Sequence, residues 1–276
     1  MVVYAGQGDP RRSMALLWRT PWESAAHTAP GPKPELSIDL VVKAAIEVAD
    51  ADGMAALSMR AVGERLGRTA MSLYTYVAGK NELIDLMYDH AFTEIATDSS
   101  PADLAAEAGS DGDDWRAATT AWAVRLWRFY LRHPWSLQVS HARPVLGPNE
   151  YALFEALATV LHRAGLLPKE ISWAHGSIHH LVRGVVSTAA EARHSFNATG
   201  VGENEWWHER SAELEKVCPD FSERFPTLVL MESQGAFVNE DQSKPYLEQE
   251  AWETFQFGLE ALLDGIQRRL LSEAER

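Results

Sequence analysis

Apolar residues recur every three or four positions along most of the chain, which is the spacing of an α-helix buried on one face. The first such run begins after Ser37, a good N-terminal cap, and ends at Asp52-Gly53, where glycine can adopt a left-handed conformation. Its apolar positions are Ile38, Val41, Val42, Ala45 and Ala49. The pattern predicts a helix of about four turns.

Three shorter helices are predicted within the next forty or so residues. Ser58 caps the first of them and Gly67 ends it. The next begins at Thr69 or Ala70, and its residues Leu73 and Val77 are expected to face inward. The run KNELIDLMYDHAFTEI, which follows Gly79, predicts another helix.

Beyond residue 114 the apolar pattern predicts longer helices over residues 115–133, 150–164, 168–190 and 247–271. Residues 98–114 are rich in Asp, Ser, Ala and Gly, and we expect a loop or linker there. Between 192 and 244, glycines and prolines predict only short pieces. Because no useful run alternates with a period of two, the chain is predicted to be all-α.

The first 35 residues predict a mobile arm with one or two helical turns, because AHTAPGPKPEL cannot form regular hydrogen-bonded structure. Arg11, Arg12, Arg19 and Lys33 could place this arm in a DNA minor groove, but a plain disordered tail is the favoured interpretation. The predicted organisation is an arm (1–35), a small helical domain (36–95) and a larger helical domain (114–276).

Composition narrows the class of protein. Hydrophobic residues make up 46% and charged residues 23% of the 276, with a mean hydropathy of -0.22, which is typical of a globular protein. Cys218 is the only cysteine, which excludes an intrachain disulfide and a Cys-rich zinc site. The longest stretch without Asp, Glu, Lys or Arg is 171–182, too short to span a bilayer. We therefore expect a cytoplasmic protein with no signal peptide.

The formal net charge of -14 argues against a polyanionic partner, but the acidic residues are unevenly distributed. Residues 1–80 carry nine Lys and Arg against eight Asp and Glu, so the acid belongs to the rest of the chain. Within Ser58–Lys80 there are four basic residues and a single acidic one, Glu64. This window could face a phosphate backbone.

The two short helices around Gly67 form a predicted helix-turn-helix, whose second helix can enter a DNA major groove. With Leu73 and Val77 inward, its outer face presents small and hydroxyl-bearing side chains that suit base edges. Arg60 is the candidate for a bidentate guanine contact, and Tyr74 and Lys80 are candidates for phosphate contacts.

The segment LSMRAVGERLGRTAMSLYTYVAGKNELIDLM resembles the DNA-binding segment of the tetracycline-repressor (TetR) family of bacterial regulators. The resemblance covers about Leu36 to Phe92 and continues weakly through the HPW and GPNEY segments. It implies a homodimer that binds a palindromic operator, with an acidic helical domain that holds a small-molecule inducer. The positions that it assigns to DNA contact are Arg60, Thr69, Ala70, Met71, Ser72, Tyr74, Tyr76 and Lys80.

Ordinary packing is the alternative for each of these features. The paired helices could belong to an unrelated bundle, Met71 and Tyr74 could pack between helices, and Arg65 and Arg68 suit a solvated face.

Aromatic and histidine side chains indicate a ligand pocket in the larger domain, although core packing explains most aromatic stripes. The candidate ligand-binding residues are Trp122, Phe129, Trp173, His175 and His179. The segment HGSIH lacks the glutamate of HExxH and a third ligand, so we expect no metal and no cofactor. The metal and drug ligands of the tetracycline repressor itself cannot be matched here.

The helices 168–190 and 247–271 resemble the pair that dimerises this family, with burial inside one chain as the alternative. The leading hypothesis is a ligand-responsive transcriptional regulator, a repressor released by an inducer. One rival is a helical enzyme that uses His175, His179 and Glu191. The other is a helical interaction module that binds no DNA.

Overall fold

The computed structural model describes residues 2–19, 36–97, 99–110, 114–239 and 243–274. Across these residues the secondary structure is helical, apart from an isolated parallel bridge between Val3 and Val139. The all-α prediction is confirmed. The chain forms two compact units, one made of Met1–His180 with Leu262–Arg276 and the other of Leu181–Ala261.

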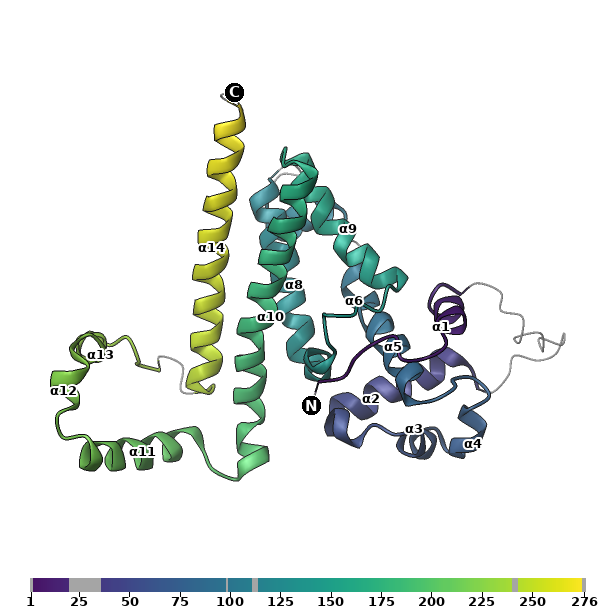
Figure 1. Cartoon of the computed structure of the whole chain (residues 1–276), viewed down its shortest axis with the longest axis horizontal. Helices are drawn as coiled ribbons and strands as arrows, with labels where there is room; N and C mark the ends of the chain where they lie inside the picture. Colours follow the sequence, from purple (N-terminus) through teal and green to yellow (C-terminus); the bar gives the residue numbers. More distant parts are fainter. Residues whose placement is uncertain (1, 20–35, 98, 111–113, 240–242, 275–276) are drawn as a thin grey trace. The chain divides into compact units, whose positions relative to one another are not determined.

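The first unit begins with five helices, drawn in purple and blue in Figure 1. They are α1 (Pro10–Leu17), α2 (Ile38–Ala56), α3 (Met59–Leu66), α4 (Ala70–Leu73) and α5 (Lys80–Ala91). Both predicted serine caps are present: the Ser37 and Ser58 hydroxyls accept from backbone amides at 3.2 and 3.1 Å. Gly53 breaks α2 with a φ of 78°, so the first helix ends where the sequence predicted.

Residues 2–19 differ from the predicted mobile arm. The expected two helical turns form α1, which packs against α5. Arg12 Nε lies 3.1 Å from Glu82 Oε1, and the Gly6 amide donates to both Asp85 carboxylate oxygens at 3.1 Å. These polar contacts hold the segment, which sequence reasoning could not anticipate because its partners lie some 70 residues away. Lys33 and the rest of the expected arm lie outside the described residues.

The first unit continues through short and long helices that carry its larger core. They are α6 (Thr93–Ala96), α7 (Pro101–Glu107), α8 (Trp115–Arg132), the 3₁₀ helix η1 (Pro134–Gln138) and α9 (Pro148–Arg163). The predicted helices 115–133 and 150–164 are present as α8 and α9. The predicted loop 98–114 is partly wrong, because Ser100 and Asp103 form a capping box and Leu104 and Ala105 are fully buried in α7.

A buried carboxylate joins α5 to the start of α9. Asp89 accepts hydrogen bonds from the Asn149 amide and side chain at 2.9 Å and from the Glu150 amide at 3.0 Å. Burial raises the pKa of Asp89, although these hydrogen bonds oppose the rise. A Cβ on Gly147 would lie 2.1 Å from Asp89 Oδ1, so only glycine leaves room for this contact.

A second polar contact joins α2 to the end of α8. The buried His133 ring places Nδ1 2.7 Å from Asp50 Oδ1 and Nε2 3.3 Å from Glu94 Oε1. The Trp135 indole N–H also donates to Asp50, at 2.8 Å. The two carboxylates outweigh burial and raise the pKa of His133. The HPW segment thus anchors the first helices to the larger core.

The second unit contains parts of α10 (Pro168–Thr199) and α14 (Tyr246–Ala274), with α11 (Glu203–Val217), α12 (Phe221–Arg224) and α13 (Pro226–Ser233) between them. Arg193 on α10 makes a bidentate ion pair with Glu248 on α14, at 2.8 and 2.6 Å. The predicted helices 168–190 and 247–271 are present and extend further. The region 192–244, whose apolar pattern is weak, contains α11, α12 and α13. The weak pattern agrees with their exposure, because no residue of α11 or α13 is buried.

Gly63 packs α3 against the turn that precedes α4. An added Cβ would lie 2.7 Å from the Arg68 carbonyl oxygen and 3.2 Å from the Ala70 nitrogen, both backbone atoms. We expect Gly63→Ala to lower the free energy of unfolding by about 1 to 3 kcal/mol through overpacking, measured by urea titration. Gly79→Ala is the control, because nothing lies within 4 Å of its added Cβ. Equal stability of the two variants would show that the turn yields without cost.

Candidate functional site

The turn between α3 and α4 has the geometry that the sequence predicted. Gly67 ends α3 in the left-handed conformation, with φ 64° and ψ 32°. Thr69 then caps α4, and the Ser72 hydroxyl donates to the Thr69 carbonyl at 2.7 Å. The α-helical span of α4 is shorter than expected, but a hydrogen bond from the Val77 amide to the Leu73 carbonyl at 3.0 Å continues the helical path.

Burial separates the two faces of this segment. Leu73 and Val77 have no exposed surface, as the apolar spacing predicted. The opposite face carries Thr69 and Met71, of which Met71 is 75% exposed, with Ala70 and Ser72 half-buried beside them. A large methionine left in water by a helix that buries its other face is available to a partner.

Two cations lie before and after this segment in the sequence. Arg60, with 86% of its side chain exposed, makes an i,i+4 ion pair with Glu64 at 2.8 Å. An exposed pair of this kind contributes little stability, so Arg60 can exchange it for another acceptor. Lys80 Nζ lies 3.4 Å from the Met54 carbonyl oxygen and is half-buried.

The two tyrosines at the end of α4 differ. Tyr74 is 45% exposed, which favours an outward role over packing between helices. Tyr76 is half-buried, and its carbonyl accepts from the Arg12 side chain at 3.3 Å. Arg65 makes an exposed ion pair with Glu47 at 2.6 Å, and Arg68 is exposed, as expected of a solvated face.

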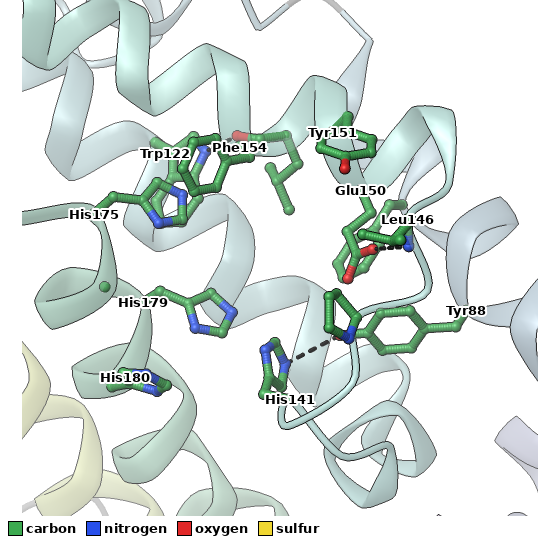
Figure 2. Close-up of a pocket in the computed structure, with 14 residues that line it drawn as sticks. Tyr88, Trp122, His141, Leu146, Glu150, Tyr151, Phe154, His175, His179 and His180 are labelled. Atoms are coloured by element: carbon green, nitrogen blue, oxygen red, sulfur yellow. Dashed lines mark hydrogen bonds between the residues drawn. The ribbon is translucent and has the colours of Figure 1, made fainter. Parts of the chain in front are cut away.

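A cavity of about 450 Å³ lies among α5, α8, α9 and α10, entirely within the first unit (Figure 2). This volume falls in the range of pockets that hold small organic molecules. Its lining is largely aromatic and includes Tyr88, Phe92, Trp122, Tyr151 and Phe154.

Histidines form the polar side of the cavity. In Figure 2, His141, His175 and His179 lie around one part of it, with His180 further along α10. His141 Nε2 lies 3.1 Å from the Tyr88 hydroxyl, and His179 Nε2 lies 3.3 Å from the Tyr130 hydroxyl. Glu150 accepts from the Leu146 amide at 2.7 Å, and burial raises its pKa. Within the described residues, no group of three or more His, Cys, Asp or Glu is arranged to hold a metal ion.

The cavity contains three of the five residues predicted to bind a ligand. Trp122, His175 and His179 line it. Phe129 does not: it is buried behind the wall and stacks on Phe92 with ring centroids 4.6 Å apart. Trp173 does not line the cavity either: it is 57% exposed, and the Lys169 ammonium lies over its ring. Trp173 precedes His175 by two residues, so it lies on a different face of α10 from His175 and His179.

Sequence reasoning missed the residues that come from other helices. Tyr88, His141, Glu150 and Phe154 line the cavity, yet they belong to α5, α9 and the loop before α9. Nothing local in the sequence shows that these segments meet. Glu191, named with the enzyme alternative, is not among the lining residues.

Two family models match the chain. One, described as bacterial regulatory proteins of the tetR family, matches residues 41–87, which contain the helix-turn-helix. The other, described as the tetracyclin repressor-like C-terminal domain, matches residues 108–270, more than half of the chain. The chain belongs to the TetR family. It is therefore a helix-turn-helix transcriptional regulator, as the resemblance in the sequence indicated.

Relatives within the TetR family agree with this assignment. The chain is 37% identical to the HTH-type transcriptional repressor DrrR1 of Streptomyces coeruleorubidus over 95% of its own length and 87% of that protein. It is 35% identical to an HTH-type transcriptional regulator of Saccharopolyspora erythraea over 60% of its length and 66% of that protein.

Solved TetR-family structures share the fold. Apo ActR of Streptomyces coelicolor gives a TM-score of 0.61 at 21% identity, covering 87% of this chain and all of ActR. ActR in complex with actinorhodin gives 0.61 at 22% identity, covering 85% of this chain and 96% of ActR. Among the described helices of this TetR-family chain, none combines the length and apolar character that crossing a membrane requires.

The state of His175 makes stability depend on pH. Burial, with a smaller effect of His180, lowers the pKa of His175 from 6.5 to about 4. Between pH 6.5 and about pH 4, His175 binds a proton in the unfolded chain but not in the folded protein. The free energy of unfolding therefore falls as the pH drops through this range. We therefore compare the free energy of unfolding of His175→Phe with that of the wild type by urea titration at two pH values. The difference in favour of the variant should be about 1 to 2 kcal/mol larger at pH 5 than at pH 7.5.

His162→Phe, an exposed histidine on α9, is the control and should show no such gain. A stability difference between His175→Phe and the wild type that is the same at both pH values would contradict the assignment.

Proposed function

We propose that this TetR-family protein represses transcription by binding a palindromic operator as a homodimer, and that a small molecule in the cavity releases it. The observation that carries the proposal is the two-faced segment at α4, in which Leu73 and Val77 are fully buried while Met71 and Thr69 are exposed. A short helix of this kind, set after a tight turn, can dock in a major groove. Since its partner is the bacterium's own DNA, we place the protein in the cytoplasm.

We keep residues 36–95 as the DNA-reading domain and 114–276 as the ligand-binding and dimerisation domain. DNA contact is assigned to the exposed or half-exposed positions around α4, namely Arg60, Thr69, Ala70, Met71, Ser72, Tyr74, Tyr76 and Lys80. Thr69 and Ser72 supply hydroxyls for base edges, Met71 and Ala70 suit a thymine methyl group, and Lys80 suits a phosphate. The mechanism is a shift between two arrangements of the same helices, so no chemical step is needed.

A gel-shift titration against DNA fragments that the protein selects from a random pool tests operator binding. Arg60→Ala should weaken binding by about 1 to 3 kcal/mol and relax the preference for one sequence, because it removes a guanine contact. Lys80→Ala should weaken binding to all sequences alike and lower its salt dependence, because it removes a phosphate contact.

Arg163→Ala, an exposed arginine on α9, is the matched control for loss of charge. If the wild type shows no sequence-specific and salt-sensitive binding, the proposal is lost. If Arg60→Ala weakens binding to all DNA sequences equally, Arg60 does not contact base edges.

We propose that the protein dimerises through α10 and α14, although most of the apolar side chains in the stripe of α14 are already buried within one protomer. Phe255 and Leu259 are buried within the protomer, as the intrachain alternative anticipated. Other apolar side chains of these helices remain exposed, above all Phe257 on α14 at 77% and Phe196 on α10 at 60%. These are the surfaces left for a second copy.

We expect Phe257→Glu to shift the protein from dimer to monomer in sedimentation velocity runs and to weaken operator binding with it, because it places a charge in an apolar interface. Val2→Glu changes an equally apolar exposed residue outside these helices and should leave the dimer intact. A Phe257→Glu protein that remains dimeric at the same concentration would move the interface elsewhere.

A further inference from the structure

One polar atom in the cavity wall has no partner. His175 is 8% exposed, and its Nε2 is buried without a hydrogen bond from any described residue. The neighbouring imidazoles are different, since Nε2 of His141 and of His179 each lies beside a tyrosine hydroxyl. A buried polar atom without a partner costs free energy, so its retention beside a cavity points to a ligand group that completes it.

The surroundings of His175 are aromatic. Its ring centroid lies 4.0 Å from that of Phe154 and 5.6 Å from that of Trp122, and Figure 2 shows the three side chains together at one end of the cavity. The same environment keeps the imidazole neutral, because burial lowers the pKa of His175 to about 4. A neutral imidazole offers one donor and one acceptor.

The charge of the lining selects against anions. Among the lining residues, the only carboxylate is that of Glu150, and none is Lys or Arg. An anionic ligand would lose its hydration without gaining the permanent charge of a Lys or Arg, and His175 itself is neutral, whereas a neutral ligand needs no such partner. The cavity therefore suits an uncharged aromatic molecule.

We infer that His175 determines ligand specificity by recognising a hydroxyl group carried on the aromatic ring of a neutral ligand. A hydroxyl both donates and accepts, so it completes Nε2 whichever nitrogen carries the proton. The ring that bears it packs against Phe154 and Trp122. The inference rests on the proposed function, because it takes the cavity as the ligand site, and it adds the class of ligand and the residue that selects it.

Three naphthalene probes test this, titrated into the full-length protein by isothermal calorimetry: 2-naphthol, its isostere 2-methylnaphthalene, and the slightly larger anion 2-naphthoate. The wild type should bind 2-naphthol about tenfold more tightly than 2-methylnaphthalene, the upper range for one hydrogen bond, and 2-naphthoate most weakly. His175→Phe should lose the preference for the hydroxyl, because it keeps the ring and removes both nitrogens.

His175→Gln keeps a donor and an acceptor and should retain part of the preference, which separates hydrogen bonding from a packing defect. His162→Phe should behave as the wild type. Equal binding of 2-naphthol and 2-methylnaphthalene to the wild type, an unchanged preference in His175→Phe, tightest binding of 2-naphthoate or no binding of any probe would each overturn the inference.

A parallel gel-shift with the selected DNA separates the two proposals. His162→Phe should bind DNA as the wild type does, because His162 is exposed on α9, outside both the cavity lining and the proposed reading segment, residues 69–77. If the wild type binds DNA and the probes fail, only the specificity inference is lost. If the probes behave as expected and DNA binding is absent, the proposed function fails and the ligand site stands.

Discussion

The carboxylate of Asp89 is the contact that joins the helix following the proposed reading segment, residues 69–77, to the wall of the cavity. It lies on α5, the helix that starts immediately after the reading segment, and it accepts three hydrogen bonds from the first turn of α9. The same first turn carries Glu150 and Tyr151 into the cavity wall, and α5 itself contributes Tyr88. One buried side chain thus ties the wall of the cavity to α5, the helix that follows the proposed reading segment.

Under the proposed function, this arrangement gives a physical route from the ligand to the DNA. A ligand shifts an equilibrium only by binding one arrangement better than another, and packed helices change by discrete steps. In this chain a displacement of α9 must either carry α5 with it or leave a buried carboxylate without its donors, which is costly. The His133 contact with Asp50 and Glu94 is a second polar connection, between the end of α8 and α2.

Local patterns predicted the reading segment well. The spacing of Leu73 and Val77, the caps at Ser37 and Ser58 and the left-handed Gly67 each depend on residues a few positions apart, and the structure has all of them. The α7 helix was missed because it carries a single leucine among alanines, which gives only a weak apolar face, although the spacing of Ser100 and Asp103 is that of a helix start. The cavity was only partly predicted, because His141 and Phe154 belong to segments that only the tertiary fold brings together. Trp173 is the converse case: it is exposed and does not line the cavity, since aromatic character alone does not fix which way a side chain points.

The ion pair between Arg12 and Glu82 ties the proposed DNA-reading domain, residues 36–95, to a segment that precedes it in the chain. Glu82 is buried and also accepts from the Ala78 amide at 2.6 Å, next to the reading segment. The family model begins at residue 41, so a truncation drawn at that boundary would strip Glu82 of its counter-ion. A fragment intended for solution work on DNA recognition should therefore keep residues 2–19, because removing them takes away the cation that pairs with Glu82 and the helix α1 that packs against α5.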